Sequence, residues 1–180
     1  FPAGNVTAGK VLKVDSVSGS GTTGIGTLTF GDAGGSTPAF EATRTSNQDF
    51  SSSTYTKFQA NVETFDTDSA YDNSTNYRFT PQTAAKYFVY ARLQIDCQAA
   101  SNLKQGVTRI YKNGSVTLQT QMNMADNQNE NINVSCYGIV DMNGSSDYLE
   151  AYAYAIDESG GPTIRATSYP WSIFGAFKIG

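Results

Sequence analysis

The residues of this chain that could carry out chemistry are few, and their types restrict that chemistry. The 180-residue sequence contains no histidine, so the commonest general base and the commonest metal ligand are both missing. A Ser-His-Asp or Cys-His site therefore cannot form within this chain. Catalysis by two carboxylates would need a pair about 5 to 9 Å apart in a cleft, and the sequence marks no such pair. We expect no enzymatic activity and no cofactor.

Three carboxylates close together form a cluster that could bind a cation. Asp66, Asp68 and Asp72 lie in one turn-rich segment, and calcium prefers clustered oxygen ligands. The segment lacks the glycine and the distal glutamate of an EF-hand loop, however. A solvated acidic loop is the favoured interpretation, and calcium binding is the alternative.

Composition and charge argue against several classes of partner. The net charge of −4 and the isoelectric point near 4.7 disfavour nucleic acid, which needs a basic surface. No apolar run approaches the roughly 18 residues of a membrane span, and no secretory leader is recognisable. A chain that starts at Phe1 is expected to be processed, a fragment, or a sequence whose start was not captured. We expect no nucleic-acid binding and no membrane insertion.

The residues that must position any site predict an all-β protein. Tyr, Phe and Thr are abundant and suit a pleated surface, while Gly, Asn and Ser suit turns. Residues 1–37 are rich in Gly, Ser and Thr and predict either a flexible linker or an extended N-terminal arm that orders against a neighbour. Lys10–Val14 is the one strand expected there. Residues 38–180 are expected to form one globular head.

Short strand patterns follow one another closely in the head, as in a β-sandwich. Asn113-Gly114 predicts a two-residue hairpin, because these residues adopt the positive φ values of a type I′ turn. The expected strands are Ala39–Thr45, Tyr55–Glu63, Tyr77–Thr80, Lys86–Asp96, Val107–Lys112, Ser115–Met124, Asn131–Met142, Tyr148–Ile156 and an interrupted Thr163–Ile179.

Alternation assigns one face of each long strand to the core. In the strand Lys86–Asp96, Phe88 and Tyr90 fall on the face opposite the core. Aromatic rings on a solvent face need a cover, so these two residues are predicted to lie in a subunit interface. The predicted core faces are Tyr87, Val89, Ala91, Leu93 and Ile95; Val116, Leu118 and Met122; and Ile132, Val134, Cys136, Gly138, Val140 and Met142.

A series of short motifs between Ala39 and Ile179 resembles the globular head shared by complement-1q and tumour-necrosis-factor proteins. Their order and spacing are more specific than any single motif. The chain departs from the family pattern at Ala85-Lys86 and Ser146-Asp147, where the family usually has a glycine. The motifs are Ala39-Phe40; Phe79-Thr80-Pro81 followed by Tyr87; Lys112-Asn113-Gly114; Asp147-Tyr148-Leu149-Glu150-Ala151; and Phe174-Gly175-Ala176-Phe177.

The resemblance implies a ten-stranded antiparallel jelly-roll sandwich assembled as a homotrimer, with one sheet packed around the threefold axis. It also implies that the loops at 98–105, 125–130 and 157–162 form an exposed tip opposite the C-terminus, and functional loops often lie on such rigid scaffolds. A solvated loop end is the alternative. The candidate contacts for a glycan or cell-surface protein are Asn102, Lys104, Asn127, Asn129, Asp157 and Glu158.

The family pattern also orients the strand Tyr148–Ile156. It places Leu149 and the alanines that follow inside, so that Tyr148, Tyr152 and Tyr154 form an outward aromatic surface. Such a surface could stack on sugars or pack against a neighbour. The reverse orientation, with the tyrosines in the core, is the alternative, because alternation alone does not decide between them.

The two cysteines, Cys97 and Cys136, fall on core faces of strands that are neighbours in the implied topology. A disulfide can form if they lie directly opposite each other. Two buried free thiols are the equally ordinary alternative. The cysteines therefore indicate no particular redox compartment.

The expected function is that of a non-enzymatic recognition protein. We expect a trimeric head displayed on a virion, as a phage fibre, spike or decoration protein, that binds a host glycan or receptor. The opening Phe1-Pro2-Ala3-Gly4 resembles segments that lead into heads of bacteriophage fibre and virion proteins. The N-terminal arm would contact other virion or surface proteins. A secreted complement-1q-like ligand or lectin of a cellular organism is the alternative, so the expected location is the virion surface or the extracellular space.

Overall fold

The chain falls into two compact units, Phe1–Ser36 and Thr37–Gly180. In the part that the structure describes, every regular element is a strand, so the predicted all-β class is confirmed. The computed structural model describes residues 10–18, 25–32, 37–124, 129–166 and 171–179.

The N-terminal unit contains a β-hairpin. β1 (Lys10–Ser18) pairs antiparallel with β2 (Ile25–Asp32), with a shift of register between Val14 and Ser16. β1 includes the predicted strand Lys10–Val14, whereas β2 was not predicted. The role of residues 1–37 as a linker or as an arm that orders against a neighbour stays a prediction. In residues 25–32, threonines alternate with Leu28 and its apolar neighbours, a pattern that favours a strand. The glycine-rich composition of the surrounding segment made this pattern hard to recognise.

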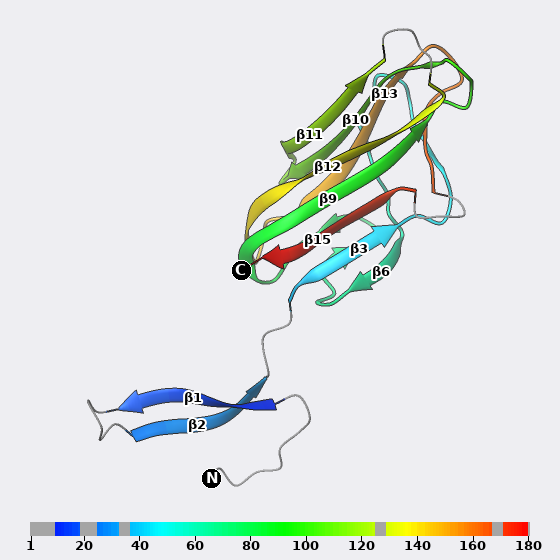
Figure 1. Cartoon of the computed structure of the whole chain (residues 1–180). Coiled ribbons are helices and arrows are strands. Elements are labelled where there is room, and N and C mark those ends of the chain that lie inside the picture. The colour runs from blue at the N-terminus through cyan, green and yellow to red at the C-terminus, as the bar shows by residue number, and fades with distance from the viewer. Residues whose placement is uncertain (1–9, 19–24, 33–36, 125–128, 167–170, 180) are drawn as a thin grey trace. The chain divides into compact units, whose positions relative to one another are not determined.

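The head is a sandwich of two antiparallel sheets, whose long strands lie in two layers in Figure 1. Most of the predicted strands overlap observed ones, and the last predicted strand is interrupted as expected. The strands are β3 (Ala39–Thr43), β4 (Gln48–Asp49), β5 (Thr56–Lys57), β6 (Val62–Asp66), β7 (Tyr71–Asp72), β8 (Arg78–Phe79), β9 (Ala84–Asp96), β10 (Leu103–Lys112), β11 (Ser115–Asn123), β12 (Asn131–Asn143), β13 (Leu149–Asp157), β14 (Thr163–Ile164) and β15 (Ile173–Ile179).

The order of the strands gives the sandwich its two faces. The seven-stranded sheet runs β4-β14-β9-β15-β3-β6. β14 and β15 pair with successive parts of one edge of β9, and β12 pairs with its other edge. The six-stranded sheet runs β11-β10-β13-β8-β7, and β5 also pairs with β13. The arrangement is a jelly roll, as predicted, although several two-residue strands raise the number of strands above ten.

The predicted strand Tyr55–Glu63 is wrong as one element, because the chain changes sheets within it. β5 belongs to the six-stranded sheet and β6 to the seven-stranded sheet, and Phe58 between them is fully buried. The buried side chain of Gln48 replaces a strand neighbour there. Its Nε2 donates to the carbonyl of Lys57 at 2.7 Å, and its Oε1 accepts from the amide of Gln59 at 2.9 Å.

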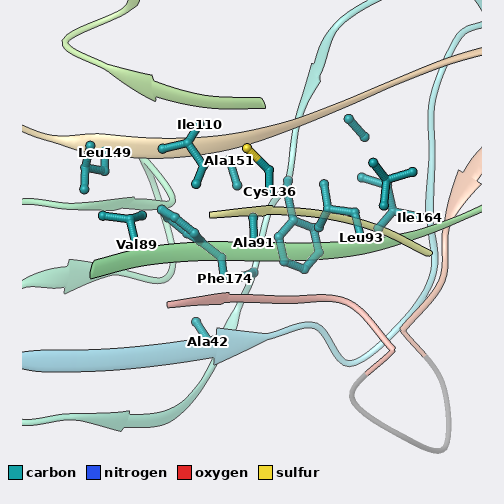
Figure 2. Packing of buried hydrophobic residues seen from close by; sticks show 14 of the residues in the cluster. Ala42, Val89, Ala91, Leu93, Ile110, Cys136, Leu149, Ala151, Ile164 and Phe174 are labelled. Atoms are coloured by element: carbon teal, nitrogen blue, oxygen red, sulfur yellow. The ribbon is translucent and has the colours of Figure 1, made fainter. Parts of the chain in front are cut away.

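The core lies between the sheets, where side chains from both layers meet (Figure 2). The predicted core face of β9, from Tyr87 to Ile95, is at most 1% exposed, and the face of β12 from Ile132 to Met142 is likewise turned inward. The prediction for β11 is wrong at two positions: Val116 and Met122 are 47% and 45% exposed. β11 is an edge strand, so its ends lie beyond the opposing sheet.

Aromatic residues from separate family-like motifs converge in one buried cluster. The ring centroid of Phe40 lies 4.4 Å from that of Phe79 and 5.1 Å from that of Phe174, and Phe79 lies 5.6 Å from Tyr87. All four side chains are fully buried. Such aromatic pairs contribute about 0.5–1.5 kcal/mol beyond their buried area. These four aromatic members of the family-like motifs are therefore core residues that specify the fold.

The chain enters and leaves the head at the same end. Phe177 of β15 pairs with Ala39 of β3, and the amide of Lys178 donates to the carbonyl of Pro38 at 2.8 Å. The β10–β11 turn also follows the prediction, because Asn113 and Gly114 have φ values of 53° and 78°. The loops after β9 and β13 lie at the opposite end, which we call the tip.

Candidate functional site

The outer face of the seven-stranded sheet carries most of the large apolar side chains that the described residues expose. Cross-strand register places Tyr137 beside Tyr90, and both Ile139 and Phe177 beside Phe88. On the far side of β3, β6 adds further members to the same face. Five of the eight large exposed hydrophobic residues lie here, between 37% and 66% exposed: Val62, Phe65, Tyr137, Ile139 and Phe177. With Phe88 and Tyr90 we call them the apolar face.

Phe88 lies at the centre of the apolar face. Its ring centroid is 5.4 Å from Phe177, 6.1 Å from Tyr137 and 6.3 Å from Tyr90. Phe88 and Tyr90 are half-buried and point away from the core, on the face to which alternation assigned them. The rings of Phe88, Tyr90, Tyr137 and Phe177 form a continuous aromatic surface across three strands.

Tyr90 is fixed by a residue two strands away in the sheet. Its hydroxyl donates to Oε2 of Glu41 at 2.9 Å, and the ring passes over Gly175 of the intervening β15. Burial raises the pKa of Tyr90, and the Glu41 carboxylate raises it further. The polar tip of this ring is therefore satisfied within the chain, which leaves an apolar surface outward.

The outer face of the six-stranded sheet carries tyrosines. The residues Leu149 to Ala155 that alternate along β13 are fully buried, so the predicted inward orientation of this set is confirmed. Tyr148, Tyr152 and Tyr154 are half-buried and lie on the outward side. The alternative, with the tyrosines in the core, is wrong.

These tyrosines are ordered by neighbours that alternation did not identify. Tyr154 stacks on Tyr55 with ring centroids 4.6 Å apart, and Tyr152 lies 4.4 Å from Tyr111. The carboxylate of Glu150 accepts from Lys57 Nζ at 2.6 Å and from the Tyr152 hydroxyl at 3.4 Å. Burial raises the pKa of Tyr152 to about 12, with Glu150 contributing. We call this surface the tyrosine face.

Two of the predicted ligand contacts at the tip are structural. Asn102 is 4% exposed, and its Nδ2 donates to the carbonyls of Cys97 and Ser159. Its Oδ1 accepts from the amides of Glu158 and Ser159 at 2.9 and 3.0 Å. Because these bonds use the whole amide, Asn102 holds two tip loops together and is not available to a ligand. Asp157 likewise accepts from the Gly161 amide at 3.0 Å, which closes its own loop.

Other predicted tip residues do reach the surface. Lys104 and Glu158 form an ion pair at 2.8 Å and are 44% and 50% exposed in their side chains. Asn129 is exposed, and its carbonyl accepts from the amide of Leu103 at 3.1 Å. Asn127 lies outside the described residues. The structure therefore brings residues 129–130 together with the loops after β9 and β13, and it leaves Lys104, Asn129 and Glu158 accessible.

The cysteines are buried free thiols. Cys136 lies opposite Ala91 in the β9–β12 ladder, whereas Cys97 lies beyond the Asp96–Asn131 pair at the end of that ladder. The two residues are thus several ladder positions apart, and the condition for a disulfide is not met. Burial raises the pKa of Cys97 to about 12, so its thiol is protonated and unreactive at neutral pH.

The acidic segment uses its carboxylates to hold its own turns. Asp66 accepts from the amide of Tyr71 at 2.8 Å. Asp72 accepts from the amides of Thr75 and Ser74, and these bonds hold its pKa well below the usual range. Among the described residues no three acidic or cysteine side chains converge as a cation site would require. The calcium alternative for Asp66, Asp68 and Asp72 is therefore not supported by the geometry.

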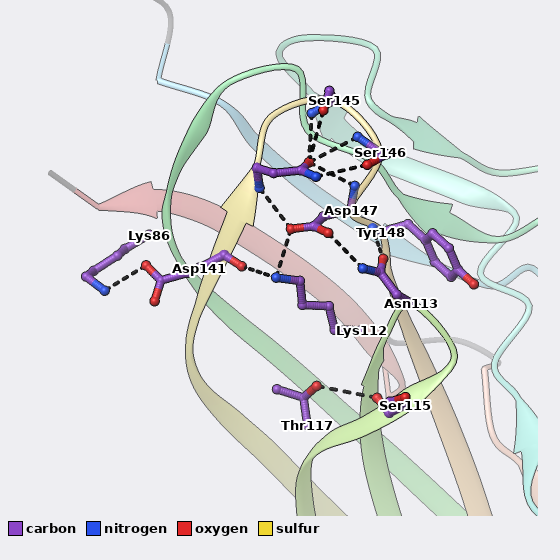
Figure 3. A network of polar contacts seen from close by, with 11 residues as sticks. Lys86, Lys112, Asn113, Ser115, Thr117, Asp141, Ser145, Ser146, Asp147 and Tyr148 are labelled. Carbon is purple, nitrogen blue, oxygen red and sulfur yellow. Dashed lines mark hydrogen bonds and ion pairs between the residues drawn. The ribbon is translucent and has the colours of Figure 1, made fainter.

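A polar network at the end opposite the tip accommodates the departure at Ser146-Asp147 (Figure 3). The side chain of Asp147 accepts from Lys112 Nζ at 2.8 Å, from Asn113 Nδ2 at 2.7 Å and from the amide of Asn143 at 2.9 Å. The Lys112 and Asn113 bonds, with that of the Asn143 amide, lower the pKa of Asp147 to about 2. The network joins two turns and is structural.

Sequence reasoning missed several surface residues. Tyr137 and Ile139 alternate with the core residues of β12, and this pattern alone could have added them to the apolar face. Tyr55 and Arg109 contribute to the tyrosine face through contacts between segments far apart in the sequence, for which no local signal exists. The described part of the chain contains no helix of the length and hydrophobicity needed to cross a membrane.

Comparison with known proteins supports the fold. Neither a protein-family model nor a curated protein sequence matches this chain. Solved structures do match. The globular domain of zebrafish complement 1qA protein has a TM-score of 0.54 at 15% identity, covering 80% of this chain and 98% of that one. Eiger TNF from S. frugiperda has a TM-score of 0.53 at 12% identity, covering 80% and 93%.

A third structure, murine APRIL, gives a TM-score of 0.52 at 8% identity, with 79% of this chain and 99% of that one covered. The three neighbours are C1q-like and TNF-like jelly-roll domains, and the head of this chain has the same fold. Identities this low show the fold alone.

Proposed function

We propose that this chain is a non-enzymatic recognition protein whose head assembles as a homotrimer through the apolar face. The carrying observation is the gathering of Tyr137, Ile139 and Phe177 around Phe88, with Phe65 of β6 on the same outward sheet face. Burying apolar surface is worth about 25 cal/mol per Å², and contiguous exposed apolar patches mark interaction sites. The complement-1q and TNF resemblance, which implies one sheet around a threefold axis, supports the choice of this face.

The proposed setting is the surface of a virion, as a fibre, spike or decoration protein. The N-terminal unit would attach the head to other virion or surface proteins. Lys104, Asn129 and Glu158 at the tip would contact a host glycan or receptor, since they remain accessible. A secreted ligand or lectin is the alternative setting, and it uses the same assembly.

The assembly is tested by measuring the mass of the full chain in solution by light scattering. A trimer is expected, and Tyr90→Glu or Ile139→Glu should shift it to monomer, because each places a charge in the apolar face. Val116→Glu is the matched control: Val116 is 47% exposed on β11 of the other sheet, and this variant should remain trimeric. A monomeric unmodified chain at micromolar concentration overturns the proposal.

The setting is tested by electron cryomicroscopy of particles from the source, with antibody labelling of the head. Labelled projections on the particle surface are expected. Unlabelled particles, together with the chain in culture medium, would instead establish the secreted ligand or lectin.

A further inference from the structure

The tyrosine face holds an arginine that has no carboxylate partner among the described residues. The guanidinium carbon of Arg109 lies 3.7 Å from the ring centroid of Tyr55. Its Nε donates to Oε1 of Gln119 at 2.5 Å, and Nη1 donates to the Tyr111 hydroxyl at 3.4 Å. Neutral groups therefore fix the fork of this side chain, and its remaining N–H groups and its charge stay uncompensated.

The carboxylate nearest in the sheet is already neutralised. Glu150 lies opposite Tyr111 in the β10–β13 ladder, and its side chain is 8% exposed. Lys57 Nζ approaches it at 2.6 Å, and the Tyr152 hydroxyl donates to its second oxygen. Arg109 is thus a positive centre on this face of a chain with a net charge of −4.

A row of exposed amides runs beside Arg109 along β11. Gln121 Nε2 donates to Oδ1 of Asn123 at 3.0 Å, and Gln105 Nε2 donates to the same atom at 2.8 Å. Register places Gln119 directly opposite Arg109. Gln119, Gln121 and Asn123 are all exposed. Amide side chains both donate and accept hydrogen bonds, which suits the hydroxyl groups of a sugar.

We propose that the tyrosine face binds an acidic oligosaccharide, in which Arg109 receives the carboxylate of a uronic or sialic acid residue. The planar guanidinium matches a carboxylate in a two-bond fork. The amides of Gln119 and Gln121 bind the sugar hydroxyls, and the half-buried tyrosines supply an apolar surface for the sugar ring. The inference names the ligand class of the recognition role proposed above and so rests on that role.

Binding is tested on the full chain by titration with sialyllactose and oligogalacturonate. Lactose and methyl-esterified oligogalacturonate are the neutral controls, and both should bind at least about tenfold more weakly, because a charge-assisted hydrogen bond is lost. Arg109→Gln should weaken binding of the acidic sugars by roughly 10- to 100-fold. Arg109→Lys should recover only part of it, since an ammonium lacks the fork. Gln121→Ala should reduce affinity without disturbing the Arg109 contacts.

Controls separate this site from other surface cations and from folding. Lys86→Gln removes an exposed cation of the seven-stranded sheet and should leave affinity unchanged, while thermal melting of Arg109→Gln verifies that the fold is retained. Equal affinity for neutral and acidic sugars, unchanged binding in Arg109→Gln, or binding of polyglutamate in preference to the sugars would overturn the inference. A trimer that fails to bind acidic sugars overturns this inference alone, whereas a monomer that binds them overturns only the proposed assembly.

Discussion

The Tyr90 hydroxyl donates to the carboxylate of Glu41 at 2.9 Å across the backbone of Gly175. A Cβ at position 175 would overlap Cζ and the hydroxyl of the Tyr90 ring and would lie 2.9 Å from the carbonyl of Phe40. The missing side chain is therefore what lets the ring lie flat across β15. It sets the position of Tyr90 within the apolar face.

Gly175→Ala is expected to displace the Tyr90 ring and break its bond to Glu41. The free energy of unfolding should fall by about 2 kcal/mol or more. The lost hydrogen bond accounts for about 1 kcal/mol, and the close contact with the carbonyl of Phe40 adds overpacking strain of about 1–3 kcal/mol. Assembly should weaken more strongly, since the ring would disturb the proposed contact surface. Urea unfolding and concentration-dependent mass measure the two effects. A variant that assembles like the unmodified chain would contradict this account of Tyr90.

Arg165→Met is expected to leave the carboxylate of Asp96 buried without its cation. Arg165 Nε lies 2.7 Å from Asp96, whose side chain is 3% exposed. Because the arginine itself is partly exposed, the free energy of unfolding should fall by about 2 kcal/mol, between the values for surface and buried ion pairs. Lys86→Met breaks the exposed pair with Asp141 and serves as the control, with a change within about 0.5 kcal/mol in urea unfolding. Equal losses in the two variants would refute the distinction.

Stability should fall in acid through Asp147. Its pKa in the folded chain is about 2, below the ordinary 3.8, so the folded state binds protons less readily than the unfolded chain. Its contribution is therefore complete above pH 3.8 and disappears as the pH falls towards 2. Melting temperatures between pH 6 and pH 2 should converge for the unmodified chain and Asp147→Asn. Asp72, whose pKa is also lowered, keeps its own acid dependence in both proteins. Parallel curves would rule out this role for Asp147.

Asn102→Ala is expected to release the tip loops. Four hydrogen bonds of the buried amide are lost, and the carbonyls of Cys97 and Ser159 lose the donor Nδ2 of Asn102. The cost should be about 2 kcal/mol, and the amide of Ser159 should exchange faster with solvent deuterium. The amide of Glu158 keeps its bond to the backbone carbonyl of residue 102 and should change less. The exposed Asn129 provides the comparison, since Asn129→Ala should change stability by less than about 0.5 kcal/mol. Unchanged exchange at residue 159 would show that the Asn102 side chain does not hold the loops.

Both cysteines should titrate as thiols without any reductant. Cys97 and Cys136 are buried, so a thiol reagent should label neither in the folded chain and both after denaturation. The raised pKa of Cys97 adds to the protection, because the thiolate is the reactive form. Recovery of fewer than two thiols in denaturant would indicate a disulfide and refute the register of the β9–β12 ladder.

Alternation predicted the parts of the fold that depend on a single strand. The core face of β9, the Asn113-Gly114 turn and the outward tyrosines of β13 all follow from local periodicity or from the family pattern. Alternation failed where a segment changes sheets, as between β5 and β6. Phe58, Ala60 and Val62 alternate as in one strand, yet Phe58 and Ala60 are buried and Val62 is exposed. It also failed at Val116, which is exposed because β11 is an edge strand.

The candidate site was harder to predict than the fold. Asn102 and Lys104 are polar residues of the same loop region, and nothing in the sequence distinguishes their roles. The side chain of Asn102 is buried and fully hydrogen-bonded inside the tip, whereas that of Lys104 is exposed. Only the partner loop at 158–159 decides between these fates. The same holds for Arg109, because its neighbour Tyr55 comes from the segment before β5 and its neighbour Gln119 from β11.

The shared end of β3 and β15 has a mechanical consequence. Ladder hydrogen bonds run perpendicular to antiparallel strands. A force applied at Pro38 and Lys178, which are hydrogen-bonded neighbours, would open this ladder one bond at a time. A force between Pro38 and a ligand held at the opposite end would instead load the bonds of β3 together, in shear. A head that is attached through its N-terminal side and bound to a ligand at its opposite end is therefore loaded in shear, the direction in which the ladder resists force best.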